Sequence, residues 1–402
     1  MANIQIIKNK YNMKKNLLTI IIVIMMTLSI KAQDSGMCGD NLTWHWNAND
    51  STLTIVGTGD MWDYPHFDIP GGHISTSATL LKHVIIESGV TSIGAGAFSY
   101  HINLQDVSLP NTLISIGDKA FRTAVKLSSI EIPDSVTTIG DEAITGTDIE
   151  SLTLGNSVSS IGESAFADNH YLKYVSIPNS LKTIPSAAFW RCTTLEYVDF
   201  GDSLVSIGEH AFRDCALTTV SLPETLQSIG DLAFLSTNIS SVRIGSSVSN
   251  IGIYAFCSNV TIKEVFCGAT TPPDCMILNN SSTFTSDTYE QGTLYVPLGC
   301  KSLYENADTW KKFTNIVESG VSVNEDFDDS ISVFPNPSSD FININCKNMK
   351  SIEIISMEGK TIKNTSVDSD CIHVDISNLP SGIYLLMIKT EQTCLTREIV
   401  KK

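Results

Sequence analysis

Residue types that support catalysis or metal binding are present in this chain, but they are scattered. The eight histidines stand at positions 45, 66, 73, 83, 101, 170, 210 and 373, and no two are four residues apart. The sequence contains no HExxH, GxSxG, Walker or helix-opening GxGxxG motif, and its ten cysteines form no CxxC pair. Because a reaction centre needs convergent groups, the sequence predicts a protein that is not an enzyme and that uses no metal ion or cofactor.

Side chains suited to binding a partner occur at a regular spacing instead. Tyr174 and Tyr197 lie in the matching segments KYVSI (173–177) and EYVDF (196–200), in which Asp199 follows Tyr197 by two residues and Glu196 directly precedes it. Tyrosine is enriched at binding hot spots. Tyr174, Tyr197, Asp199 and Glu196 are therefore the candidate ligand-binding residues. The alternative is that they are strand residues that merely tolerate solvent.

The spacing of the two tyrosines follows an internal repeat with eight copies. The copies read VTSIGAGAF (90–98), LISIGDKAF (113–121), VTTIGDEAI (136–144), VSSIGESAF (158–166), LKTIPSAAF (181–189), LVSIGEHAF (204–212), LQSIGDLAF (226–234) and VSNIGIYAF (248–256). The step from one copy to the next is nearly constant, as these bounds show. Self-similarity at a fixed period is the signature of a stacked repeat architecture.

Each copy also contains a short segment in which apolar and polar residues alternate, such as 172–177. The alternation predicts a strand that points Val175 and Ile177 inward and Tyr174 and Ser176 outward. One such unit cannot bury its apolar residues alone, whereas stacked neighbours can. The sequence therefore predicts a mainly β solenoid of short strands, in which the Ile-Gly step turns the chain and the Ala-Phe pair fills the interior.

Stacking is expected to align equivalent residues in columns. The phenylalanines form one column, interrupted by Ile144, and the glycines form another, interrupted by Pro185. Cys192 and Cys215 occupy equivalent positions in adjacent coils, where strands ~4.8 Å apart suit a packed pair of thiols, which we favour, or a disulfide. Acidic residues that follow the glycines are interpreted as solvated turn residues, with a weak calcium site as the alternative: Asp118, Asp141, Glu163, Glu209 and Asp231.

Residues 38–318 resemble the BspA-like branch of the bacterial leucine-rich repeats, because the pattern L-x-x-V-x-I-P-x-x-V-x-x-I-G-x-x-A-F fits nearly every copy. Residues 38–61 resemble the N-terminal hairpin of that family, and 293–313 resemble its closing segment. A solenoid needs such caps, because an open end exposes core and unpaired strand edges. We assign 34–80 to an N-terminal β-hairpin cap, 81–268 to the solenoid and 269–318 to a C-terminal cap, with a loop over 269–292.

The C-terminal part is a separate unit. Residues 319–330 are interpreted as a linker, and the short apolar strands within 331–402 predict a small β-sandwich. This segment resembles the type A C-terminal sorting domain of the type IX secretion system, on FPNP (334–337), MEGK (357–360), LPSGIY (379–384) and a basic end. The resemblance implies the type IX secretion machinery as a partner, removal of the domain, and release or attachment at the cell surface. An ordinary accessory β-domain is the alternative.

Charge and the N-terminal residues bear on partners and location. The net charge of −17 at pH 7 repels phosphate backbones and anionic lipid, so nucleic acid is not an expected partner. The apolar run 17–30 follows Lys14 and Lys15 and is shorter than the ~20 residues of a spanning helix. We interpret 1–33 as a secretory signal peptide, with a membrane anchor as the alternative, and expect no membrane-spanning segment after its removal.

These features predict a protein that is secreted by a Gram-negative bacterium or attached to its outer surface. We expect an adhesin-like binding module whose ligand is a host or neighbouring-cell protein or a glycan. A structural surface-layer scaffold without a dedicated ligand is the second hypothesis. An enzyme would require a catalytic cluster within 60–80 or 269–292, the least regular stretches.

Overall fold

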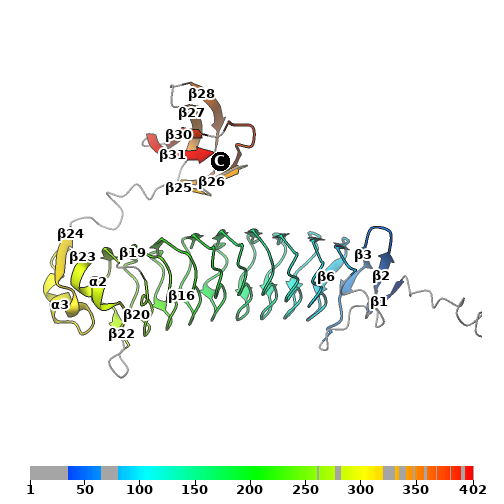
Figure 1. Ribbon diagram of the computed structural model, residues 1–402, viewed down its shortest axis with the longest axis horizontal. Helices are drawn as coiled ribbons and strands as arrows, with labels where there is room; N and C mark the ends of the chain where they lie inside the picture. Colours follow the sequence, from blue (N-terminus) through cyan, green and yellow to red (C-terminus); the bar gives the residue numbers. More distant parts are fainter. Residues whose placement is uncertain are drawn as a thin grey trace, which may run out of the picture.

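The computed structural model describes residues 35–64, 80–259, 262–276, 282–319, 331–334, 341–346, 349–356, 360–367, 369–380, 382–390 and 394–401. The predicted signal peptide (1–33), linker residues 320–330 and the Pro-Asn-Pro motif (335–337) lie outside these residues. Residues 65–79 and 277–281, from the two irregular stretches, lie outside them as well. Figure 1 shows a row of short coils and, beside it, a group of strands formed by the C-terminal residues.

Each coil contributes two short strands, and equivalent strands of neighbouring coils pair in parallel and in register within sheets of two to five strands, with breaks between some neighbouring coils. The first row consists of β5 (His83–Ile86), β7 (Asp106–Ser108), β9 (Ser129–Glu131), β11 (Ser151–Thr153), β13 (Tyr174–Ser176), β15 (Tyr197–Asp199), β17 (Thr219–Ser221), β19 (Ser241–Ile244) and β21 (Glu264–Cys267). The predicted solenoid of short strands is confirmed.

The second row of strands was not predicted. It consists of β4 (Gly59–Asp60), β6 (Val90–Ile93), β8 (Ser115–Ile116), β10 (Thr138–Ile139), β12 (Ser160–Ile161), β14 (Thr183–Ile184), β16 (Ser206–Ile207), β18 (Ser228–Ile229), β20 (Asn250–Ile251) and β22 (Asp274–Cys275). The interpretation of the Ile-Gly step as a turn is therefore wrong in one respect, since the isoleucine ends a strand. Its side chain is buried, as at Ile207 and Ile229, so each two-residue strand that ends in isoleucine anchors its coil with one inward residue.

The phenylalanine column forms the centre of the core. Six neighbouring pairs from Phe98 to Phe284 stack with ring centroids 5.2–5.4 Å apart and interplanar angles of 4–13°. Ile144 fills the gap between Phe121 and Phe166 and is itself fully buried. Offset aromatic stacks of this kind add to the free energy gained by burying the rings, so every coil stabilises both of its neighbours.

The glycine column exists because neighbouring coils approach closely. A Cβ on Gly230 would lie 2.6 Å from the backbone nitrogen of Glu209, and one on Gly208 would lie 2.6 Å from the carbonyl carbon of Pro185. Neither glycine has a positive φ. A side chain here would clash with the preceding coil, so clearance between coils, and not backbone freedom, requires glycine.

Left-handed backbone occurs at two other positions of each coil. They lie two residues before and two residues after the residue that the coil contributes to the phenylalanine column. All sixteen residues at these positions have φ between 51° and 70°, and only Gly96 and Gly146 are glycines. Their N–H groups bond the next coil, as in Ala187 N–H to the Glu209 carbonyl and Arg191 N–H to the Arg213 carbonyl, both 2.8 Å. These inter-coil bonds hold non-glycine residues in a conformation that costs roughly 1–2 kcal/mol per residue.

The N-terminal cap continues the first row beyond the first coil. β1 (Ser35–Gly39) pairs antiparallel with β2 (Leu42–Asn47), which pairs antiparallel with β3 (Thr52–Gly57). β3 lies parallel to β5 of the first coil. Trp44 on β2 is fully buried. The predicted hairpin is confirmed, and it covers the open end of the core.

The C-terminal cap contains more structure than the predicted loop over 269–292. That interpretation is wrong, because the stretch includes β22, Phe284 of the aromatic column and α2 (Ser286–Gln291), whose N-terminus is capped by the Thr285 hydroxyl. β23 (Thr293–Pro297), α3 (Lys301–Asn306), the 3-10 turn η1 (Trp310–Lys312) and β24 (Asn315–Ser319) follow. Trp310, buried at 1% exposure, lies edge-on to Phe284 with centroids 6.0 Å apart and closes the column.

The C-terminal strands form two antiparallel sheets. One has the order β25 (Ile331–Phe334), β26 (Phe341–Cys346), β29 (Cys371–Asp375), and the other has the order β28 (Thr361–Ser366), β27 (Met349–Ser356), β30 (Gly382–Thr390), β31 (Cys394–Lys401). Their buried residues, among them Ile344, Ile354 and Leu386, make a core that shares no residue with the core of the solenoid. The described residues between Ser35 and Ser319 thus have a core and two caps of their own.

The left-handed positions generate a prediction about stability. We expect Ala187→Gly to raise the free energy of unfolding by about 0.5–1 kcal/mol, because glycine adopts positive φ without strain. Ala188→Gly removes the same methyl group from the adjacent, fully buried residue and should lower stability by about 1–2 kcal/mol. Urea unfolding of 34–318, followed by circular dichroism, measures both. Equal effects of the two substitutions would contradict the role assigned to positive φ.

Candidate functional site

The two predicted tyrosines lie side by side on the outward face of the first strand row. β13 and β15 pair in parallel with Tyr174 opposite Tyr197 and Ser176 opposite Asp199. The tyrosine rings stack with centroids 5.8 Å apart and an interplanar angle of 19°. Val175 and Val198, between these residues, are buried in the core, so the inward valines fix the direction of the outward side chains.

Asp199 completes the group on this face. The Ser176 hydroxyl donates to Asp199 Oδ2 over 3.2 Å, and the Gly201 N–H donates to Oδ1 over 3.1 Å. Burial raises the pKa of the Asp199 carboxyl, and these hydrogen bonds oppose the shift. Burial also raises the pKa of the Tyr174 hydroxyl well above its usual range. The group, named here the tyrosine patch (Tyr174, Tyr197, Ser176 and Asp199), is partly shielded from water.

The fourth predicted residue is not part of the patch. Glu196 precedes β15, and its side chain is exposed. Its side chain takes no part in the hydrogen bonds that join Asp199 to Ser176 and Gly201. Glu196 can contribute charge near the patch, but the geometry does not hold it there.

A second aromatic group lies farther along the same face. Arg243 on β19 places its guanidinium carbon 4.5 Å from the ring centroid of Phe266 on β21. Phe266 stacks on Tyr295 of β23 with centroids 4.5 Å apart. Tyr295 is a functional candidate that sequence reasoning missed, because 293–297 lies outside the repeat period. Its register with the outward residue Phe266 is the signal that identifies it.

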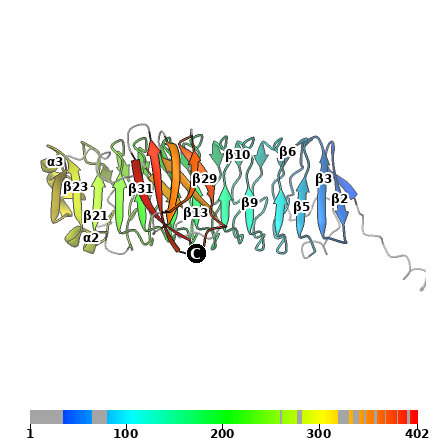
Figure 2. The same ribbon diagram turned by 90° about the horizontal axis from the view of Figure 1, so that it is seen from above.

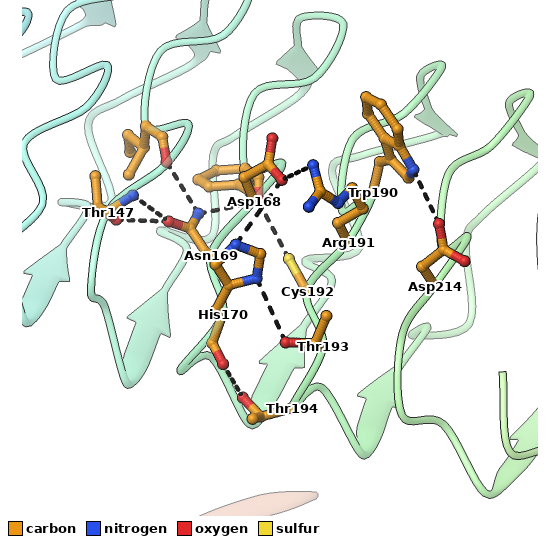
Figure 3. Close-up of polar contacts among 12 residues, drawn as sticks. Thr147, Asp168, Asn169, His170, Trp190, Arg191, Cys192, Thr193, Thr194 and Asp214 are labelled. Carbon is orange, nitrogen blue, oxygen red and sulfur yellow. Dashed lines mark hydrogen bonds and ion pairs between the residues drawn. The ribbon is translucent and has the colours of Figure 1, made fainter. Parts of the chain in front are cut away.

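Asn169 is the centre of a buried polar network that has a structural explanation (Figure 3). Asn169 Oδ1 accepts from the Thr147 N–H (2.9 Å) and hydroxyl (2.6 Å), and Asn169 Nδ2 donates to the carbonyls of Ile144 and Phe166, both 2.9 Å. Cys192, in the equivalent position of the next coil, donates to the Phe166 carbonyl. Asn169 and Cys192 each lie three residues after a member of the phenylalanine column. Side chains at this position donate hydrogen bonds to carbonyls that would otherwise be buried without a partner.

Cys192 and Cys215 are free thiols in this structure, as the favoured interpretation predicts. Their Sγ atoms lie 3.2 and 3.1 Å from the carbonyl oxygens of Phe166 and Phe189, respectively. Burial raises the pKa of Cys192 to about 12. A buried thiol with a raised pKa has little thiolate and is a poor nucleophile, so the pair contributes packing and hydrogen bonds to the core.

The repeated acids bridge neighbouring coils. Asp118 Oδ1 accepts from the Asp141 N–H (2.9 Å), and Asp141 Oδ1 accepts from the Glu163 N–H (2.8 Å). Asp231 Oδ1 accepts from the Ile253 N–H in the same way. Across the part of the chain that the structure describes, no group of three or more His, Cys, Asp or Glu residues is arranged to hold a metal ion. The acids are exposed or half-buried turn residues, and the carboxylates of Asp118, Asp141 and Asp231 each accept a hydrogen bond from the backbone of the next coil.

Two further observations concern the cap and the membrane. Trp44 is buried and Trp46 packs against the core, while Trp62 is 46% exposed and donates to Asp40 over 3.1 Å. No helix within the described ranges is long and apolar enough to cross a membrane.

The repeated coils, their phenylalanine column and the two caps define a leucine-rich repeat solenoid protein. Residues 76–196 and 182–272 match the family described as BspA type Leucine rich repeat region, in 6 copies. Residues 332–402 match the Secretion system C-terminal sorting domain. The solenoid therefore belongs to the BspA-type leucine-rich repeat family and is followed by a type IX sorting domain. The protein is exported and is either secreted or attached to the surface of a Gram-negative bacterium.

Several solved structures are similar to this chain. A leucine-rich repeat protein from Bacteroides ovatus ATCC 8483 is 17% identical, with 70% of this chain and 99% of that chain covered and a TM-score of 0.37. A leucine rich cell surface protein from Faecalibacterium prausnitzii A2-165 is 19% identical, with 59% and 96% covered and a TM-score of 0.25. The pneumococcal vaccine antigen PcpA is 14% identical, with 71% and 98% covered and a TM-score of 0.31. No curated protein matches the chain.

The network around Asn169 generates a prediction that separates structure from function. Asn169→Ala should lower the free energy of unfolding of 34–318 by about 3 kcal/mol, because each orphaned buried group costs ~1–3 kcal/mol. Asn169→Cys should cost less, since a thiol at this position donates to a carbonyl in two neighbouring coils. Asn156→Ala, at an exposed turn, is the control and should change stability by less than about 0.5 kcal/mol. Urea unfolding midpoints give the order, and equal losses for Ala and Cys at 169 would contradict it.

Proposed function

We propose that this exported protein is an adhesin-like binding module, without catalytic activity, that captures a protein or glycan on the outward face of its first strand row. The observation that carries the proposal is the stacked pair Tyr174 and Tyr197 with Asp199 beside it. Two aligned aromatic faces offer a flat apolar strip with polar ends, and the carboxylate favours a ligand that donates hydrogen bonds or carries positive charge.

The shape of the face favours an extended ligand. Three strand steps separate β15 from β21, or about 14 Å at ~4.8 Å per step. A ligand that contacts both the tyrosine patch and the Phe266–Tyr295 pair would lie along the solenoid axis, the direction in which solenoids present their binding surfaces. Arg243 at the second group gives the face both signs of charge.

The direct test is ligand capture by residues 34–318. We expect this fragment, displayed to arrays of extracellular-matrix proteins, neighbouring-cell proteins and glycans, to retain a restricted set of ligands. If the fragment captured only other copies of itself, the result would support the second hypothesis, a surface-layer scaffold. Turnover of any captured ligand would point to an enzyme.

The tyrosine patch generates a prediction about affinity. Replacement of both Tyr174 and Tyr197 by Ser should weaken capture at least tenfold, because hot-spot tyrosines contribute ~2 kcal/mol or more. Tyr171 and Tyr254 are 53% and 40% exposed and lie outside the strand face, so Tyr171→Ser with Tyr254→Ser is the matched control and should leave the affinity unchanged. Biolayer interferometry measures the Kd of each variant, and circular dichroism verifies that the variants fold. Equal affinities of the two double variants would refute the patch as the binding site.

A further inference from the structure

We propose that the tyrosine patch is also the docking surface for the chain's own C-terminal sorting domain, so that the binding face stays covered until that domain is removed. The docking itself is independent of any ligand. Only its consequence for binding rests on the function proposed above. The occupant is the outward face of the β25–β26–β29 sheet, named here the docking face and defined by Asn345 and Cys371.

A direct contact joins the two surfaces. Asn345 Nδ2 on β26 donates to Asp199 Oδ2 over 2.7 Å, across 146 residues of sequence. The same carboxylate oxygen accepts from Ser176. Asp199 therefore bonds its neighbour in the solenoid and the sorting domain at once.

The register of the sorting domain brings a second residue to the same place. Asn345 lies opposite Cys371 of β29, and residues directly opposite in an antiparallel pair point to the same side of the sheet. Burial is the main cause of the raised pKa of the Cys371 thiol, and the negative charge of Asp199 adds to it. Burial is also the main cause of the raised pKa of Tyr174, to which Cys371 adds. The opposite side of the sheet carries Ile342, Ile344 and Val374, which are buried in the domain's own core. One side of the sheet thus packs in the core of the sorting domain, and the other, polar side contacts the solenoid.

The arrangement of the two parts agrees with this contact. In Figure 1, β25 and β26 are the strands of the sorting domain nearest to the solenoid, and in Figure 2 the domain overlies the middle coils around β13. Charge also permits the approach. Residues 331–402 contain seven lysines and one arginine against four aspartates and four glutamates, so this unit has no net charge and is not repelled by the acidic solenoid.

The connection between the parts is long enough for the chain to fold back. From β24 to β15 there are five strand steps, or about 24 Å at ~4.8 Å per step. Eleven residues separate Ser319 from Ile331, and an extended chain of that length reaches about 40 Å. The sorting domain can therefore reach the patch within the same molecule, where its effective concentration is high.

The test uses the full chain from residue 34 and requires no ligand. Asn345→Asp places a carboxylate against Asp199 and should separate the domain from the patch by like-charge repulsion. Asn364→Asp makes the same change on β28, at an exposed position of the other sheet, and is the matched control. The readouts are small-angle X-ray scattering and the rate of tyrosine nitration, mapped by mass spectrometry. Tyr171, which is 53% exposed, is the internal reference.

We expect the wild type and Asn364→Asp to give the same compact profile and slow nitration of Tyr174 and Tyr197. Asn345→Asp should give a larger radius of gyration and at least fivefold faster nitration of both tyrosines relative to Tyr171. In the double variant Asn345→Asp with Asp199→Asn, the amide donor and the carboxylate acceptor have exchanged places, so the hydrogen bond can form again. This variant should recover the compact profile and the slow nitration of both tyrosines. This rescue separates undocking from misfolding.

Equal nitration and scattering in the wild type and Asn345→Asp would overturn the proposal, as would a wild-type chain that is already extended. Failure of the rescue with Asn345→Asp undocked would also count against the assigned contact. Because neither readout involves a ligand, failure to find one would refute the proposed function and leave the docking result intact.

Discussion

The spacing between neighbouring coils is the constraint on which the rest of this structure depends. Parallel strands pair at ~4.8 Å, and that distance recurs in everything attached to the backbone. It allows the phenylalanine rings to stack at 5.2–5.4 Å, excludes a Cβ at the glycine column, and lets one aspartate reach the N–H of the next coil. A coil cannot bury its apolar residues alone, so these contacts form together or not at all.

The same spacing explains the outward face. Tyr174 and Tyr197 stack because they occupy one position of adjacent coils, as do Arg243 and Phe266. On a globular domain, such pairs would need a specific loop conformation. Here the inward valines hold the backbone, and the outward residues can change without disturbing the core. A surface of this kind is suited to recognition by sequence variation on a constant frame.

Much of this could be predicted from the sequence, because the repeat expresses the fold directly. The nearly constant period predicts the coils, the recurring Phe predicts the column, and alternation in 42–57 predicts the N-terminal hairpin. Strands such as Ser206–Ile207 have one inward residue, so alternation could not reveal the second row. Phe284 follows Phe256 by more than one period, which hid its place in the column and made α2 resemble a loop. The boundaries assigned to the six segments stay predictions.

The candidate site was predictable only in part. Identical strand positions predicted the pairing of the tyrosines, whereas Glu196 was included by proximity in sequence, and its side chain is exposed beside the patch. Tyr295 was missed because the C-terminal cap departs from the period. The contact of Asn345 with Asp199 spans 146 residues and joins two separate cores, and no local pattern encodes such a contact. The left-handed conformation of residues such as Ala187 could not be predicted, because it is imposed by inter-coil hydrogen bonds and not by residue type.

Those left-handed positions have a consequence for how such a chain can lengthen. The inter-coil bonds at Ala187 and Arg191 involve only backbone atoms, so an added repeat brings its own full set of donors and acceptors. Gene duplication within the array would therefore create a longer solenoid without redesign of either end. Repeats added between the tyrosine patch and the Phe266–Tyr295 pair would move these groups apart by whole multiples of one strand spacing. The length of ligand needed to contact both groups would therefore change in discrete steps.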